Sequence, residues 1–199
     1  MRHTSPRESA LPRSWLAVRG KSPDAVKTEL RLRQSRLAGD DTLKFQIVGA
    51  TSDAGWYLIV ARGRDHRLVA EPVIQRLSLG CEVLTCSAEE QSIISAAAGW
   101  QDGRRVWSVS YDGEDGPADV VVDGDLPFAF SVIRAQFTAE AKAEDAGDAQ
   151  VDPMYQIPIE IVHRVTGYSP GKKSPAFTGR FALLEGLDTP WWKRWTVGG

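Results

Sequence analysis

The sequence predicts an α+β fold built on a mainly antiparallel sheet, and three observations support this. Runs rich in β-branched and aromatic residues are separated by segments with helix-capping signals. One run is apolar on both faces, as a central strand is. An Asp-Gly pair joins two further β-like runs, as in a tight hairpin. The expected order is β-α-β-β-α-β-β-β, with helices packed on one face and further helices toward the C-terminus.

The first two elements are a strand and a capped helix. Trp15–Arg19 has the composition of a strand. Ser22 is a suitable N-cap, and Pro23 suits the first helical position. The expected apolar face of this helix consists of Val26, Leu30 and Leu37.

Two strands and a short helix come next. Leu43–Val48 alternates apolar with polar residues, and Trp56–Ala61 is the run that is apolar on both faces. A short helix is expected near Val69–Leu79, with Val73, Ile74 and Leu77 buried. Gly80 suits the left-handed position that ends a helix.

A strand over Cys81–Ser87 leads to the hairpin. Asp102-Gly103 predicts a two-residue type I′ turn. This turn predicts that Trp100 pairs with Arg105 and Ala98 with Trp107. The apolar face of the ribbon would then consist of Ile94, Ala96, Ala98 and Trp100 opposite Trp107, Val109 and Tyr111.

The remaining elements are a short strand and two helices. Val120–Val122 predicts the strand, and Leu126–Ala146 the longer helix, with Asp125 as its cap. The shorter helix follows Pro158 and ends at Gly167. We expect residues 1–12 to be a disordered leader, 13–168 a single α+β domain, and 169–199 a loop-rich extension.

Composition limits the classes of partner. The chain has 199 residues and a net charge of −2, which gives no preference for nucleic acid. The first 36 residues are mostly basic, and residues 112–152 are mostly acidic. No apolar h-region opens the chain, and no run reaches the roughly 18 apolar residues of a membrane span. We therefore expect a cytoplasmic protein that binds neither nucleic acid nor membrane.

The two cysteines, Cys81 and Cys86, are five positions apart in the expected strand. Residues at that spacing point to opposite faces and lie about 16 Å apart. A disulfide needs Cα atoms within about 7 Å, and a shared metal ion needs similar proximity. Packing in the core is therefore the favoured interpretation of both residues, with a nucleophilic Cys86 as the alternative.

No motif predicts catalysis, a metal or a cofactor. Gly167-Tyr168-Ser169-Pro170-Gly171 matches G-x-S-x-G, but Pro170 lacks the N–H that an oxyanion hole requires. Glu160 and His163 have the spacing of a di-iron ligand pair, but one copy is too few for such a site. We expect a pair of residues on the helix surface.

The best binding candidate is the cluster Trp191, Trp192 and Trp195. If these side chains fold back, they close one end of the core, which we favour. If they are exposed, they form an apolar site for a partner.

Four stretches in order suggest a family. They are S-W-L-A-V-R-G-K-S-P-D-A-V, G-W-Y-L-I-V-A, L-S-L-G-C-E-V-L-T-C and A-A-G-W-Q-D-G-R-R-V-W-S-V. Residues 13–112 thereby resemble bacterial domains of unknown function. The resemblance implies an accessory or immunity-like role and brings no catalytic residues.

Three functions follow as hypotheses. The first is a non-catalytic protein that binds an unidentified protein partner. The second is a small-molecule-binding domain or minor enzyme, with a pocket over the sheet lined by Trp56, Trp107, Tyr111 and His66. The third is an oligomeric protein that assembles through the tryptophan cluster.

Overall fold

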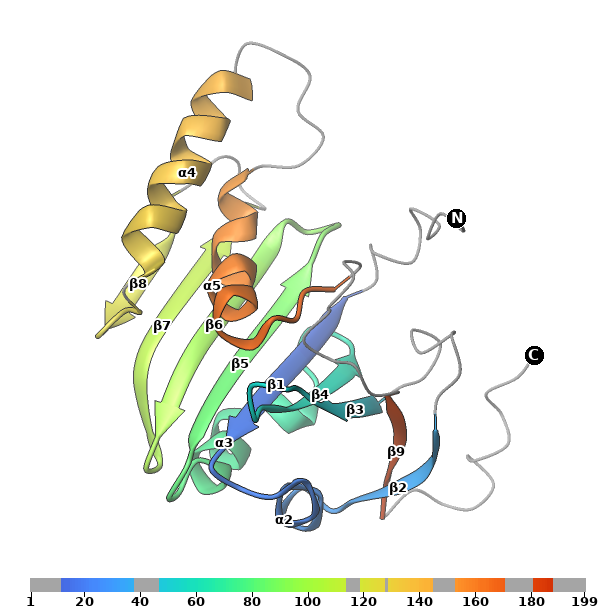
Figure 1. Ribbon diagram of the computed structural model, residues 1–199. Helices are drawn as coiled ribbons and strands as arrows, with labels where there is room; N and C mark the ends of the chain where they lie inside the picture. Colours follow the sequence, from blue (N-terminus) through green and yellow to red (C-terminus); the bar gives the residue numbers. More distant parts are fainter. Residues whose placement is uncertain are drawn as a thin grey trace, which may run out of the picture.

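In the residues that the computed structural model describes, nine strands form one antiparallel sheet (Figure 1). The model describes residues 12–37, 47–113, 119–127, 129–144, 153–170 and 181–187. The strand order is β2-β9-β3-β4-β1-β5-β6-β7-β8. The predicted α+β class is confirmed.

The strands of the sheet have the following bounds: β1 Arg13–Arg19, β2 Leu32–Leu37, β3 Ile47–Thr51, β4 Tyr57–Arg62, β5 Glu82–Glu89, β6 Ile94–Gln101, β7 Arg104–Asp112, β8 Val121–Gly124 and β9 Ala182–Gly186. The α-helices are α2 Pro23–Glu29, α3 Glu71–Leu77, α4 Ala129–Glu144 and α5 Gln156–Thr166. Two short 3₁₀ helices are η2 Arg67–Val69 and η3 Pro153–Tyr155.

The expectation that helices pack on one face is wrong: helices pack against both faces of the sheet, and each face has its own core. The α2/α3 face includes Leu16, Val18 and Val83, which pack with residues of α2 and α3. The α4/α5 face includes Trp15 and Cys86, together with residues of α4 and α5. Figure 1 shows α5 lying across β5 and β6, and α4 beside β8. The C-terminal helices therefore dock on the sheet rather than forming a separate lobe.

The helix capped by Ser22 is shorter than predicted. The Ser22 hydroxyl accepts a hydrogen bond from the Ala25 N–H at 3.2 Å, which confirms the cap. The helix ends at Glu29, and Arg31 then takes a φ of 53°. Residues 32–37 form β2 and not a continuation of the helix. The strand is favoured because β9 supplies its hydrogen-bonding partner, which local sequence periodicity does not reveal.

The middle of the chain follows the prediction closely. The central strand expected over Trp56–Ala61 is β4, and the strand expected over Cys81–Ser87 is β5. The short helix is α3, in which Ile74 and Leu77 are buried and Val73 is partly exposed. Gly80 is left-handed, with a φ of 68°. Of the strand expected over Leu43–Val48, residues 43–46 lie outside the described residues.

The hairpin has the predicted turn but a different register. Asp102 and Gly103 both have positive φ, at 50° and 77°, as a type I′ turn requires. Trp100 pairs with Arg105 as expected. A bulge then shifts the register, so that Trp107 pairs with Gly99 and not with Ala98.

The shifted register changes which residues share a face. Trp107, Val109 and Tyr111 lie opposite Gly99, Ala97 and Ser95 on the α4/α5 face. Ser95, which is not part of the predicted apolar face, is fully buried, and its hydroxyl donates to the Tyr155 carbonyl at 2.7 Å. Trp100 packs instead in the core of the α2/α3 face.

The C-terminal elements also depart from the prediction in part. Helix α4 begins at Ala129, so Asp125 is not its cap; the Asp125 N–H donates to the Val106 carbonyl at 3.0 Å. Helix α5 begins at Gln156 and not after Pro158 as predicted, and it ends at a left-handed Gly167 as expected. Part of the segment expected to be a loop-rich extension is β9, which lies between β2 and β3. None of the helices in the described ranges is long and apolar enough to cross a membrane.

Candidate functional site

The predicted binding residues Trp191, Trp192 and Trp195 lie outside the described residues. Their role therefore stays a prediction. The site that the described part of the chain supports lies around β8, the last strand in the sheet order.

The cysteines lie in separate cores, as the strand geometry predicts. Cys81 is in the core of the α2/α3 face and Cys86 in that of the α4/α5 face, and both are free thiols. Burial raises the pKa of Cys86 well above its usual value, and burial also raises the pKa of Cys81, where Lys21 opposes the effect. Since the reactive form of a thiol is the thiolate, these shifts disfavour nucleophilic chemistry at either residue.

The pocket expected over the sheet is not formed by its four predicted residues. Trp56, Trp107 and Tyr111 are buried in the core of the α4/α5 face. His66 lies apart from them as the cap of η2, where its Nδ1 accepts a hydrogen bond from the Leu68 N–H at 3.3 Å. Burial lowers the pKa of His66, and the charge of Arg67 lowers it further.

The two catalytic-looking motifs have structural explanations. Glu160 accepts a hydrogen bond from Arg164 Nε at 2.9 Å and lies 3.1 Å from His163 Nδ1, so these residues form a surface network on α5. Ser169 of the G-x-S-x-G stretch is only 4% exposed. Within the described ranges, no group of three potential ligands is placed to hold a metal ion.

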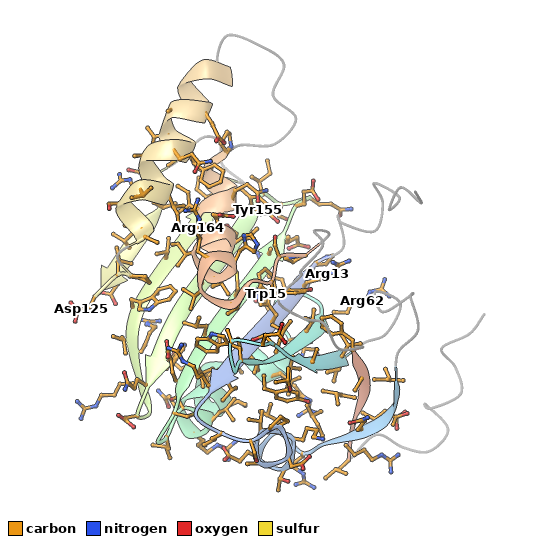
Figure 2. The ribbon with its side chains drawn as sticks, in the orientation of Figure 1. Arg13, Trp15, Arg62, Asp125, Tyr155 and Arg164 are labelled. Carbon is orange, nitrogen blue, oxygen red and sulfur yellow. The ribbon has the colours of Figure 1, made fainter. Side chains whose placement is uncertain are left out.

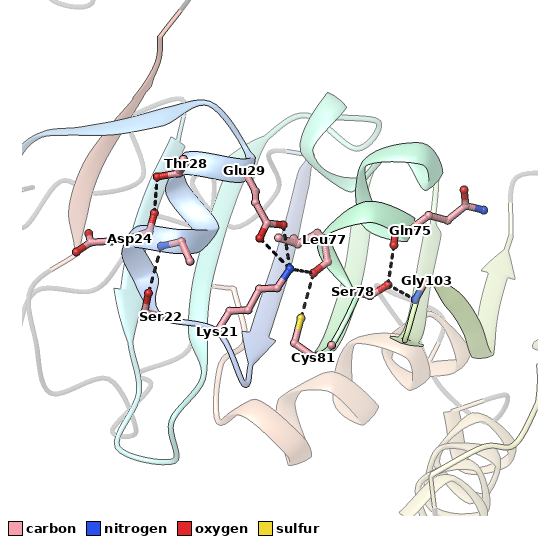
Figure 3. Close-up of polar contacts among 12 residues, drawn as sticks. Lys21, Ser22, Asp24, Thr28, Glu29, Gln75, Leu77, Ser78, Cys81 and Gly103 are labelled. Atoms are coloured by element: carbon pink, nitrogen blue, oxygen red, sulfur yellow. Dashed lines mark hydrogen bonds and ion pairs between the residues drawn. The ribbon is translucent and has the colours of Figure 1, made fainter.

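A partly exposed polar junction connects α2, α3 and the β6–β7 turn (Figure 3). Lys21 Nζ donates to both oxygens of Glu29, at 2.8 and 2.9 Å, and to the Leu77 carbonyl at 2.8 Å. The Cys81 thiol donates to that same carbonyl at 3.0 Å. The Ser78 hydroxyl accepts from the Gly103 N–H at 3.1 Å. These bonds tie α2, α3 and the β6–β7 turn together, which is a structural role.

The most exposed strand of the sheet is β8. It lies last in the strand order and pairs on one side with β7. All four of its residues are exposed, including Val121 at 69% and Val122 at 41%. Val106, the extra residue of the neighbouring bulge, is 38% exposed. Apolar side chains along two adjacent strands therefore face solvent, which is a common property of protein-binding surfaces.

The sheet next to β8 has one partly exposed face. Burial alternates along β5, β6 and β7, so that every second residue is covered by α5 or its neighbours. The residues between them are partly exposed and small: Thr85, Ser87, Ala96, Ala98, Ser108 and Ser110. Val121 extends this open face, because it pairs with Ser110.

The surroundings of β8 are acidic. The sequence from Asp112 to Asp125 holds six acidic residues and no basic one. Asp119, Asp123 and Asp125 are exposed. Figure 2 shows Asp125 at the outer end of the molecule, beside β8. This end of the sheet therefore presents negative charge around exposed valines.

A shallow hollow of about 520 Å³ runs along α4. Its lining consists of Phe130, Ser131, Arg134, Ala135, Thr138 and Ala139. Arg134 also bonds to the Asp119 carboxylate, just before β8, so the hollow begins beside the edge strand. Val122 lies opposite Val109 and therefore on the same side of the sheet as α4.

Sequence reasoning did not identify this surface. Its signal was Val120-Val121-Val122, three consecutive valines within an acidic stretch. Such a run is buried on both faces in a central strand but exposed in a short strand at an edge. Comparison of the chain with protein-family models, with curated proteins and with solved structures gave no match.

Proposed function

We propose that this chain acts by binding another protein, without chemistry of its own, and that the binding surface is the free end of the sheet. We define this free end as β8 with Val106 and the open face beside it. An accessory or immunity-like role, which the resemblance implies, would be one form of this function.

The exposure of Val121 and Val122 is the observation that carries the proposal. In the core strands β1 and β4, every apolar residue is at most 7% exposed, whereas Val121 is 69% exposed. Covering such a side chain contributes up to about 1.5–3 kcal/mol of binding free energy. The acidic surroundings would add attraction toward a basic partner and repulsion toward an acidic one.

A capture experiment with matched variants tests the proposal. The tagged full-length protein, its Val121→Asp variant and its Leu187→Asp variant are expressed in the native host. Leu187 is also exposed, at 51%, but follows β9 at the opposite end of the sheet. We expect one stoichiometric protein with the parent and with Leu187→Asp, and its loss with Val121→Asp. Equal capture by Val121→Asp, with unchanged unfolding midpoints, would contradict the proposal.

Small-molecule binding is a second candidate, which the hollow along α4 favours. Its volume of about 520 Å³ lies within the range of ligand pockets, about 300–1,000 Å³. Its described lining comes from one helix, however, whereas ligand pockets enclose most of their ligand. A thermal-shift screen of metabolites with the parent and an Ala135→Trp variant tests this function. A compound that stabilises the parent alone would support it.

A further inference from the structure

The backbone of β8 has hydrogen-bonding groups that point out of the sheet. The Asp125 N–H donates to the Val106 carbonyl directly across from it on β7. This bond shows which of the facing residue pairs of β7 and β8 are joined by hydrogen bonds. By alternation, Val121 and Asp123 bond to β7, whereas Val122 is in a non-hydrogen-bonded pair. The N–H and C=O of Val122 therefore point to the free edge. No strand pairs there within the part of the chain that the structure describes.

The part of this edge that can form backbone hydrogen bonds with another strand is short and centred on Val122. The next outward N–H, that of Val120, bonds to Asp119 Oδ1 at 2.8 Å. On the other side, Gly124 has a φ of 77° and ends the strand. A partner strand would thus form its pair of backbone hydrogen bonds with Val122 and place its flanking residues beside Asp119 and Asp123.

Charge selects among the possible occupants of this edge. A second copy of the chain would bring another acidic β8 against the first, and like charges would face each other. A segment with lysine or arginine would face Asp123 and Asp125 instead, whereas Asp119 is already paired with Arg134. The charge complementarity therefore favours a basic segment of a different protein.

We propose that β8 accepts an extended, basic segment of the partner protein as an additional strand, paired through Val122. This inference rests on the proposed function and specifies how the partner is recognised. Backbone pairing would supply affinity, while the valines on both faces and the surrounding carboxylates would supply specificity.

A synthetic peptide of alternating lysine and valine, seven residues long, tests the recognition. Amide hydrogen exchange of the full-length chain is measured by NMR with and without 1 mM peptide. We expect exchange of the Val122 amide to slow at least tenfold. Glutamate in place of lysine, or N-methylation of alternate peptide bonds on the pairing edge, should abolish the protection. No protection by the lysine peptide, or equal protection by the N-methylated one, would overturn the inference.

Two variants of Val122 separate backbone pairing from side-chain contact. Val122→Pro removes the outward N–H, and proline is tolerated where an edge N–H faces solvent. Val122→Thr keeps the N–H and a β-branched side chain. We expect Val122→Pro to remain folded and bind the peptide at least tenfold more weakly than Val122→Thr. Asp123→Asn should weaken binding about two- to fivefold.

The two proposals fail in distinguishable ways. If the captured partner is lost with Val121→Asp but binds Val122→Pro and Val122→Thr equally, the binding function stands and strand addition is wrong. If Val121→Asp captures the partner as the parent does, the proposed surface itself is wrong.

Discussion

The indole ring of Trp107 occupies the space that a side chain at Gly99 would need. A Cβ placed on Gly99 would lie 2.1 Å from Trp107 Nε1. These two residues are cross-strand partners, and the bulge at Val106 of β7, opposite Gly99 and Trp100, brings them together. The absence of a side chain at residue 99 therefore lets a buried tryptophan lie flat on the sheet beneath α4 and α5.

Gly99→Ala should destabilise the protein by about 2–3 kcal/mol, because the added methyl group displaces a buried ring. Urea unfolding of the full chain measures the cost. In a Trp107→Leu background, the same substitution should cost less than half as much, since the smaller side chain leaves room. Equal costs in both backgrounds would show that the contact with Trp107 is not the cause.

Lys21→Met should lower the free energy of unfolding by about 1–2 kcal/mol. The methionine keeps most of the apolar stem but removes the ammonium group that donates to Glu29 and to the Leu77 carbonyl. The Leu77 carbonyl then loses this hydrogen bond. Lys27→Met is the control, because the partner carboxylate in the Lys27–Asp24 pair is 91% exposed. We expect that control to change stability by less than about 0.5 kcal/mol. Similar losses in the two variants would argue against a special role for the junction.

The stability of the fold should decrease as the pH falls below about 6.5. The pKa of His66 is lowered in the folded state from its usual 6.5, because burial disfavours the charged ring. The unfolded chain then takes up a proton at a higher pH than the folded chain does. The stabilisation is therefore present above 6.5 and is lost as the pH falls through the folded pKa.

His66→Asn provides the comparison for this pH dependence, since asparagine can cap η2 without titrating. Urea unfolding of both proteins between pH 5 and 7.5 is expected to give a smaller pH slope for the variant. If the free energy of unfolding changed with pH equally in the two proteins, groups other than His66 would be responsible for the pH dependence.

Neither thiol should react with a disulfide reagent in the folded protein at pH 8, whereas both should react in denaturant. Cys86 is fully enclosed with a strongly raised pKa, and Cys81 is 7% exposed with a raised pKa. Reaction of either thiol should therefore require local unfolding, and Cys81 should react faster than Cys86. Single Cys→Ala variants assign the two phases. Rapid native reaction of either thiol would contradict the burial.

Local chemistry explains which elements the sequence predicted well. Ser22-Pro23, Asp102-Gly103 and Gly167 define a cap, a turn and a helix end through their own backbone preferences, and all three are confirmed. Cys86 lies in β5 and Cys81 immediately before it, and the two side chains lie in opposite cores as the expected alternation predicted. These features depend on neighbouring residues, and a single sequence is sufficient to identify them.

Non-local packing explains what the sequence did not reveal. Residues 32–37 continue a helical pattern in the sequence, but in the structure they form β2, which pairs with β9. The hairpin register differs from the predicted one, and Trp107 packs on Gly99, a contact that exists only in the folded hairpin. The exposure of β8 could not be predicted either, since a valine run does not indicate whether its strand is central or at an edge.

The position of β9 has a consequence for the order of events during synthesis. Arg33 of β2 bonds to Glu185 of β9, 152 positions later in the chain, and among the described residues β9 is the strand that pairs with β2. At about 5–20 residues per second, a ribosome needs roughly 8–30 s to make the intervening residues. Throughout that interval β2 has no strand to join, and the outer edge of β3 is open to incorrect pairing. The edge opposite β8 is therefore completed last during synthesis, because it needs β9 from the end of the chain.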